Sequence, residues 1–201
     1  MKIFHPSKEI MVRCVINLTK TQGIETITSD QVHKISGISK GSMYHHFKDF
    51  DELIEVAESV IYASVVDDVI SRLSTALSIS KSREDFLTAI AAITYGNQTP
   101  EKVEDRLSRI TYLAQAISSE RMKLSMGAEQ ERLTQGIADL IREAQERGWA
   151  NPNLNALAAS IFLQAFTVGR VIDYISDERV DDESWIFLIA QVVDRVIFAP
   201  V

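Results

Sequence analysis

The segment from Thr28 to Phe47 constrains the fold more than any other part of this 201-residue chain. Its sequence, TSDQVHKISGISKGSMYHHF, predicts two short helices separated by a tight corner. The first helix begins with a capping box, because the Thr28 hydroxyl and the Gln31 side chain can each satisfy a free backbone amide. Gly37 ends this helix, since a residue without a Cβ adopts a left-handed corner at little cost. Ser39 can cap the second helix, so the segment predicts a compact helix-turn-helix unit.

The second helix of this unit is expected to present an outward face of small, cationic and hydrogen-bonding side chains. Ile38, Met43 and Phe47 recur at near-helical spacing and can face a core. The outward positions are Lys40, Gly41, Ser42, Tyr44 and His45. A helix that enters a DNA groove needs a small residue for close approach, donors for phosphate oxygens and side chains that reach base edges. The pattern therefore indicates a DNA-reading helix, and the alternative for the same residues is a solvated surface turn.

The stretch from Ile10 to Leu53 resembles the DNA-binding domain of the TetR family of transcriptional repressors. At the corner and recognition helix that family has the signature Gly-(β-branched)-Ser-x-Gly-x-(apolar)-Tyr-x-His-Phe, which residues 37–47 follow position by position. The residues that correspond to the core and closing glycine of the family's first helix are Ile10, Met11, Cys14, Leu18 and Gly23. The match spans about 45 of the 201 residues. It implies a regulator, normally a repressor, that binds a pseudo-palindromic double-stranded operator as a dimer.

The resemblance also implies roles for single residues. Phosphate contacts are expected from Thr28, Tyr44 and His46. The residues expected to face the bases are Lys40, Gly41, Ser42 and His45. Ser39 at the start of the recognition helix and Lys48 just after it complete the predicted DNA-binding set.

Two residues depart from the family pattern. His33 stands where the family usually has Ala, and Phe50 replaces the Lys that usually begins the fourth helix and contacts a phosphate. Lys48 lies two residues earlier and is an alternative source of positive charge. These departures are the only support for a competing interpretation, a helical ligand-binding or interaction protein with weak or no DNA binding.

Charge is distributed unevenly along the chain, whose net charge is −7. The first fifty residues contain seven Lys or Arg and four Asp or Glu, whereas the rest contain fourteen and twenty-four. A basic N-terminal part on an acidic body suits a nucleic-acid partner, because the local field rather than the total charge governs binding. The 46% hydrophobic content is sufficient for a packed core.

Cysteine usage and the N-terminal sequence favour a cytoplasmic protein. The single Cys14 cannot form an internal disulfide, which suits a reducing compartment, and its apolar neighbours predict a packing role. Pro6 and Lys8 interrupt the N-terminus before an apolar segment of signal-peptide length can form. The uncharged run at residues 148–169 is broken by Pro and amide side chains, so we expect a buried helix and no membrane contact.

The sequence offers no catalytic residues, no metal site and no cofactor motif. His45 and His46 are adjacent on the predicted helix, so they point about 100° apart and cannot share a metal as an i, i+4 pair does. Cys14 has no nearby His to act as a base, and no glycine-rich phosphate loop is present. We therefore do not expect an enzyme.

After residue 48 the chain predicts only helices, because it contains no alternating apolar and polar run long enough for a strand. The expected helices run from 49 to about 77, from 82 to about 95, onward from 99 and from 119 to 147, followed by one that opens at Asn151-Pro152 and one that opens at Asp181. The predicted fold class is all-α with about nine helices. It comprises a three-helix helix-turn-helix DNA-binding domain at residues 1–48 and a larger helical ligand-binding and dimerisation domain at residues 49–201.

The last two predicted helices are apolar over unusually wide faces, and a monomer can cover only part of such a surface. We expect them to form a homodimer as half of a four-helix bundle. The predicted interface residues are Leu157, Ile161, Ala165, Val168, Gly169, Ile172, Ile189, Val193 and Val196. The alternative is that both helices are interior.

The resemblance further implies a small-molecule pocket in the helical body, which apolar and aromatic side chains would line. The candidates are Tyr62, Phe86, Tyr95, Tyr112, Met122, Met126, Phe162 and Phe166, and for each of them ordinary core packing is the alternative. Charged residues that could orient a polar group of the ligand are Arg106, Arg109, Arg121, Glu120 and Asp173. An apolar or amphipathic effector is expected, and its identity does not follow from the sequence.

Overall fold

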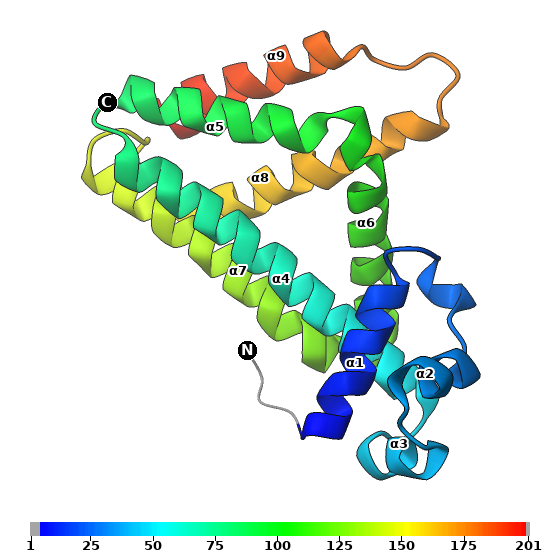
Figure 1. Cartoon of the computed structure of the whole chain (residues 1–201). Helices are drawn as coiled ribbons and strands as arrows, with labels where there is room; N and C mark the ends of the chain where they lie inside the picture. Colours follow the sequence, from blue (N-terminus) through cyan, green and yellow to red (C-terminus); the bar gives the residue numbers. More distant parts are fainter. Residues whose placement is uncertain (1–4, 200–201) are drawn as a thin grey trace.

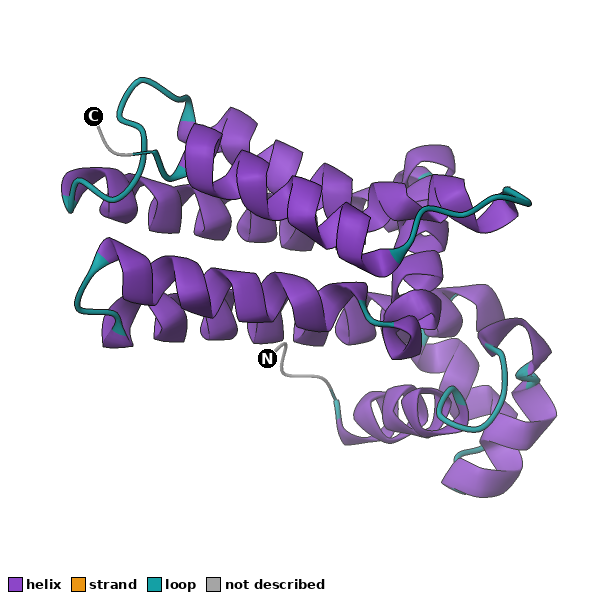
Figure 2. Cartoon of the chain, turned by 90° about the horizontal axis from the view of Figure 1, so that it is seen from above, coloured by secondary structure: helices purple, strands orange, loops and turns teal. Residues whose placement is uncertain are grey.

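The computed structural model describes residues 5–199, and this part of the chain is helical without strands (Figures 1 and 2). The helices are α1 (Pro6–Leu18), α2 (Ser29–Ser36), α3 (Lys40–His46), α4 (Phe50–Ile79), α5 (Arg83–Gln98), α6 (Val103–Ser118), α7 (Glu120–Glu146), α8 (Ala156–Gly169) and α9 (Asp182–Val192). Short 3₁₀ turns at Ile24–Thr26, Pro100–Lys102 and Arg170–Ile175 and a π turn at Val193–Ile197 join or extend them. The predicted all-α fold class is confirmed.

The corner between α2 and α3 has the local geometry that the sequence predicts. The amide of Gln31 donates to the Thr28 hydroxyl at 3.3 Å, and the Thr28 amide donates to the Gln31 side chain at 2.9 Å. Gly37 ends α2 with φ of +71°, which only glycine adopts readily. The Ser39 hydroxyl accepts from the Ser42 amide at 3.2 Å and so caps α3.

Two separate hydrophobic clusters divide the chain. The N-terminal cluster joins α1, α2 and α3 to the first turns of α4, where Leu53 and Ala57 are completely buried. The second cluster begins at Tyr62 and extends to Phe198. The expected domain boundary at residue 48 therefore lies next to the start of α4, whereas the two cores divide between Val60 and Tyr62, about three turns into that helix.

Figure 1 shows α4 and α7 side by side along the body, with α5, α8 and α9 packed above them and α6 near the N-terminal domain. The α1–α3 unit lies at one end of this body, around the start of α4. Since α4 contributes to both hydrophobic clusters, one continuous helix connects the two domains.

Two predicted helix starts are wrong by several residues. Thr99-Pro100 begins a 3₁₀ turn, and α6 starts only at Val103. Asn151-Pro152 does not open α8, because the Asn155 side chain accepts from the Ala158 amide at 3.0 Å and sets the N-cap there. The Asn151 amide instead donates to the Ile197 carbonyl at 2.9 Å, which fastens this loop to the end of the chain.

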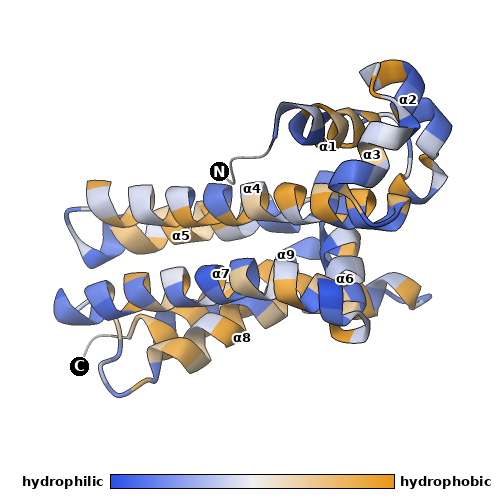
Figure 3. Cartoon of the chain, turned by 90° about the horizontal axis from the view of Figure 1, so that it is seen from below, coloured by the Kyte–Doolittle hydropathy of each residue, from blue (hydrophilic) through white to orange (hydrophobic). Residues whose placement is uncertain are grey.

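The expectation that the uncharged run forms a buried helix is also wrong. One described stretch, Ala156–Ile175, has the length and composition of a membrane span, and 28% of it is buried in the structure. It is not a uniform apolar helix, since α8 gives way to a 3₁₀ turn that contains Arg170 and Asp173. Most of α8 is hydrophobic (Figure 3), and its Ile161 and Phe162 side chains are 58% and 44% exposed, so burial within the chain does not account for this helix.

Candidate nucleic-acid interface and ligand cavity

Helix α3 lies at the outer end of the N-terminal domain, away from the body (Figure 1). Its Met43 is fully buried, and Phe47 directly after it is nearly so, which holds the helix on the domain core. Tyr44 is 59% exposed on the opposite side. Of the other residues predicted to contact DNA, Thr28, Ser39, Lys40, Gly41, His45 and Lys48 are exposed, and Ser42 and His46 are half-buried. All nine residues therefore belong to the same domain and reach its surface.

Gly41 is not required by the packing of its own chain. A Cβ built at this position would meet no atom within 4 Å, and the backbone there is ordinary right-handed helix. Glycine within a helix costs about 1 kcal/mol relative to alanine. A small residue with open space in front of it leaves the helix backbone accessible to close approach by another molecule.

Lys40 is engaged with a carboxylate in the free protein. Its ammonium nitrogen lies 2.8 Å from Asp30, and both side chains are largely exposed. The contact lowers the pKa of Asp30 and raises that of Lys40 through a hydrogen bond and charge attraction. Exposed ion pairs contribute little to stability, so Lys40 can exchange this partner for a phosphate or a base.

Three histidines gather next to α3, although only two of them are adjacent in sequence. The His5 ring centroid lies 4.7 Å from that of His46, which lies 5.1 Å from that of His45. Desolvation lowers the pKa of His46, and the nearby His5, His45 and Lys8 lower it further. Sequence spacing did not indicate the contact between His5 and His46, because helices α1 and α2 lie between these residues in the chain. Within residues 5–199, no three His, Cys, Asp or Glu side chains form a group able to hold a metal.

The two departures from the family pattern serve the internal structure of the N-terminal domain. His33 Nδ1 donates to the Ile38 carbonyl at 2.9 Å, which leaves Nε2 to accept from the Ser29 hydroxyl at 3.1 Å. His33 thus ties α2 to the corner. Phe50 is half-buried against the N-terminal core. Neither residue blocks the exposed side of α3, and Lys48 remains exposed nearby.

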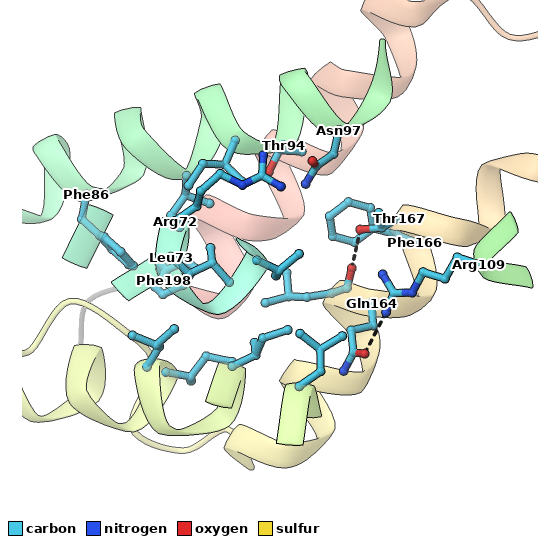
Figure 4. Close-up of a pocket in the computed structure, with 18 residues that line it drawn as sticks. Arg72, Leu73, Phe86, Thr94, Asn97, Arg109, Gln164, Phe166, Thr167 and Phe198 are labelled. Atoms are coloured by element: carbon cyan, nitrogen blue, oxygen red, sulfur yellow. Dashed lines mark hydrogen bonds between the residues drawn. The ribbon is translucent and has the colours of Figure 1, made fainter. Parts of the chain in front are cut away.

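A cavity of about 100 Å³ lies within the body between α4, α5, α7 and α8 (Figure 4). Most of its wall is aliphatic or aromatic, and the polar lining side chains are Arg72, Thr94, Asn97, Arg109, Gln164 and Thr167. Two other hollows are a groove of about 440 Å³ between α5 and α9 and one of about 370 Å³ between α4, α6 and α7. The first of these three is lined by polar side chains from α4, α5, α6 and α8.

The structure separates the aromatic and Met residues predicted to line the pocket. Phe86 and Phe166 line the cavity, whereas Tyr62 and Met126 line the groove beside α6. Met122 is packed in the body core, and Tyr112 makes an edge contact with Tyr62 at a centroid distance of 6.4 Å. Tyr95 and Phe162 line neither space, since they are 60% and 44% exposed. Aromatic character alone did not distinguish these three environments.

Of the charged residues predicted to orient a ligand, only Arg109 reaches the cavity. Arg106 is buried and donates to the Tyr174 hydroxyl and to backbone carbonyls. Asp173 accepts from the Val180 amide, and Glu120 is an exposed partner of Lys123. Arg121 forms ion pairs with Glu55 and Asp49 on or next to α4. These four residues other than Arg109 therefore have partners within the protein.

Arg109 and Gln164 face one another at the polar end of the cavity, where Arg109 Nη2 donates to Gln164 Oε1 at 2.9 Å (Figure 4). Gln164 is held in place, because it also accepts from Gln130 at 2.8 Å and donates to Thr134 at 3.1 Å. The Nε atom of Arg109 is buried and has no hydrogen-bond partner. No Asp or Glu is among the 18 residues that line this cavity.

The outer surface of α8 and α9 carries large apolar side chains in solvent. The side chains more than 40% exposed on α8, on α9 and on the turns that directly follow them are Ile161, Phe162, Ile172, Ile175, Phe187, Leu188 and Val196. Of the remaining residues predicted for the dimer interface, Ala165 is exposed, and Leu157, Val168 and Gly169 are half-buried. Ile189 and Val193 correct the prediction, because they are 4% and 5% exposed and belong to the core of their own chain.

No family model matches the sequence. The HTH-type transcriptional regulator UidR of Escherichia coli strain K12 is 18% identical over 180 residues, which cover 90% of this chain and 87% of that protein. A structure from Rhodococcus sp., assigned as a TetR-family transcriptional regulator, is 22% identical with a TM-score of 0.63 and covers 95% and 98% of the two chains. A Saccharomonospora viridis transcriptional regulator in complex with choline is 14% identical with a TM-score of 0.67, covering 96% and 98%. The similarity extends over both domains.

Proposed function

We propose that this chain, which has the fold of the TetR-family transcriptional regulators, is a ligand-responsive repressor. It binds a pseudo-palindromic operator as a homodimer, and a small apolar or amphipathic molecule releases it. It acts in the cytoplasm and has no catalytic activity of its own. The similar proteins support the general role, since they are transcriptional regulators.

The surface of α3 carries the proposal. Gly41 provides close approach, Tyr44 and Thr28 supply donors for phosphate oxygens, and Lys40 and His45 can reach base edges. These residues all project from a helix-turn-helix unit whose caps are formed by its own side chains. The unit is therefore preformed for docking in a major groove.

The exposed apolar surface of α8 and α9 supports dimer formation. A helix that carries Ile161 and Phe162 in solvent requires a partner, because exposed contiguous apolar patches usually mark interaction sites. A second copy of the same surface would also place two α3 helices at a fixed separation, as a two-fold operator demands. Burial against a second subunit would also account for the apolar composition of Ala156–Ile175 without a membrane.

Effector control is supported by the cavity in the body. Its contents would bear on α4, which is shared by the cavity wall and the N-terminal core. The choline complex of the Saccharomonospora viridis regulator supports a small-molecule role for a body of this fold. The competing function, a helical ligand-binding or interaction protein without DNA binding, lacks a structural basis in His33 and Phe50, since both support the domain core.

A gel-shift titration of the full chain against DNA that flanks its own coding region tests the proposal. Binding should weaken steeply as salt rises, because phosphate contacts release counterions. Tyr44→Ala should weaken binding to every sequence, while Tyr95→Ala is a matched control, since Tyr95 is equally exposed but lies on α5. If both variants bind like the wild type, or if no flanking DNA binds, the interaction-protein alternative replaces the repressor.

A further inference from the structure

The polar end of the body cavity has one feature that the core packing does not use. Arg109 Nε is buried without a hydrogen-bond partner, although the adjacent Nη2 donates to Gln164. Among the other described arginines, Arg170 also has a buried nitrogen without a partner, its Nη1, but its Nη2 pairs with Asp182. Arg121 and Arg83 have carboxylate partners, and Arg106 donates to the Tyr174 hydroxyl from its Nε. Arg109 has no ion pair among the described residues.

This arrangement is unfavourable for the empty protein. A guanidinium stays charged under all physiological conditions, and a buried donor that lacks an acceptor forfeits hydrogen bonds that it makes in water. A charge placed in an apolar wall is tolerated best when an anion neutralises it. The cavity supplies no anion, because its lining contains no acidic side chain.

The geometry of the Arg109 guanidinium indicates which ligand group could accept a hydrogen bond from Nε. The Nε and Nη2 hydrogens of arginine form a fork that matches the two oxygens of a carboxylate. Gln164 Oε1 already accepts from Nη2, so it holds the guanidinium plane in position without occupying the Nε donor. Figure 4 shows Arg109 and Gln164 on one side of the cavity, near Thr167.

The remaining polar groups favour an anion over a cation. Arg72 is a second guanidinium at the cavity wall, and its partner Asp68 lies outside the lining set. Thr94 adds a hydroxyl group that can donate to an oxygen, whereas the Thr167 hydroxyl already donates to the Leu163 carbonyl at 2.8 Å. A positively charged ligand would therefore meet two cations and no carboxylate.

The rest of the cavity determines the size and character of the tail. Val69, Leu73, Ile90, Leu133, Ile137 and Phe166 form an apolar wall around about 100 Å³. A dry protein cavity of about 150 Å³ accommodates benzene, so this smaller space fits a tail of about four carbons. Longer chains would have to displace side chains.

We infer that this cavity binds a small organic monocarboxylate, with the carboxylate on Arg109 and an aliphatic or aryl tail between α4, α5 and α7. The inference rests on the proposed function, because it specifies the chemical class of the effector. It also explains why Gln164, which is 9% exposed and hydrogen-bonded on several sides, is placed beside a guanidinium.

Calorimetric titration of the full-length dimer, without DNA, tests the ligand class. The probes are butanoate, hexanoate and benzoate, each compared with the alcohol of the same tail, together with hexyltrimethylammonium. We expect at least one carboxylate to bind at least tenfold more tightly than its alcohol, and we expect no heat from the ammonium compound. If no carboxylate binds, or if an alcohol binds as tightly as its carboxylate, the inference is wrong.

Two variants test the assignment to Arg109. Arg109→Gln should weaken carboxylate binding at least tenfold and leave binding of the alcohol unchanged. Arg142→Gln is the control, since Arg142 lies on the exposed side of α7 in a local pair with Asp139. Equal loss of carboxylate and alcohol binding in Arg109→Gln would overturn the assignment, because it would report a damaged cavity. The comparison between wild-type ligands does not depend on this variant folding.

A gel shift with the best carboxylate separates this inference from the proposed function. If the carboxylate binds but does not change DNA affinity, effector control is refuted, whereas the inference that the cavity binds a monocarboxylate is retained. Release of DNA by another class of compound, with no carboxylate bound, would refute the ligand class and leave the repressor standing.

Discussion

Arg121 on α7 donates two hydrogen bonds to Glu55 on α4, one from Nε to Oε2 and one of 2.9 Å from Nη2 to Oε1. Its Nη1 also lies 3.4 Å from Asp49, the residue that caps the start of α4. Glu55 stands on α4 between Leu53 and Ala57, which pack in the N-terminal core. One guanidinium therefore ties the ligand-binding body to the root of the DNA-binding domain.

We expect Arg121→Met to weaken communication between the two domains. The effector-induced fall in DNA affinity should shrink by a factor of about 2 to 30, which corresponds to about 0.5–2 kcal/mol of coupling. Gel shifts with and without the effector measure this ratio. Arg132→Met is the matched control, because Arg132 also links α7 to α4 through Asp67 but lies farther from the N-terminal domain. The same loss in both variants would show general loosening of the body.

The stability of the protein should decrease as pH rises toward neutrality because of Glu58. Burial raises the pKa of this carboxyl to about 7, and the negative charge of Glu55 adds to the effect. The folded state binds the proton more tightly than the unfolded chain, so the stabilisation is complete below the ordinary pKa of Glu and is lost as pH rises through about 7.

Relative to Glu58→Gln, the wild type should lose up to about 3 kcal/mol between pH 4.5 and pH 8, at about 1.36 kcal/mol per unit of pKa. Chemical denaturation at a series of pH values provides the measurement. The control is Glu131→Gln, since Glu131 is exposed on α7. Parallel pH profiles of wild type and Glu58→Gln would contradict the prediction.

Gly169→Arg should separate the proposed dimer without unfolding its subunits. A Cβ at Gly169 meets no atom of its own chain within 4 Å, so the subunit itself has room for the side chain. An unpaired cation buried between two subunits costs about 3–5 kcal/mol, and the dimer dissociation constant should rise more than a hundredfold. Analytical ultracentrifugation measures this. Gly96→Arg on α5 has equally open surroundings and should remain dimeric; an unchanged Gly169→Arg dimer would place the interface elsewhere.

DNA affinity should increase as pH falls from about 7.5 to 5.5. The pKa of His46 is lowered from its ordinary value by desolvation and by the nearby His5, His45 and Lys8, so protonation of this ring is disfavoured in the free protein. An adjacent phosphate favours the protonated ring, and DNA binding therefore becomes linked to proton uptake. Fluorescence anisotropy across this range should show a flatter profile for His46→Gln. His45→Gln serves as the comparison, and a profile unchanged by His46→Gln would remove this residue from the phosphate contacts.

The local structure of the helix-turn-helix unit was determined by the sequence itself. Thr28, Gln31, Gly37 and Ser39 act within three or four residues of one another, through caps and a left-handed turn that depend on little else. Helical periodicity also indicates that Met43 and Phe47 face the N-terminal core, whereas the expected core residue Ile10 on α1 is 45% exposed. For this reason the fold class, the α3 surface and the all-α body could be predicted without coordinates.

Contacts between distant helices were decided by the tertiary structure. Helix α9 is apolar on most sides, so periodicity could not show that Ile189 and Val193 face the core while Phe187 and Leu188 face solvent. The sequence does not distinguish Arg109 from Arg121, yet Arg121 is neutralised by Glu55, 66 residues away, whereas Arg109 meets only the neutral side chains of Gln164 and Tyr62. Hydrogen-bonding and packing partners that arrive from other helices depend on how those helices cross, and no local pattern encodes that geometry.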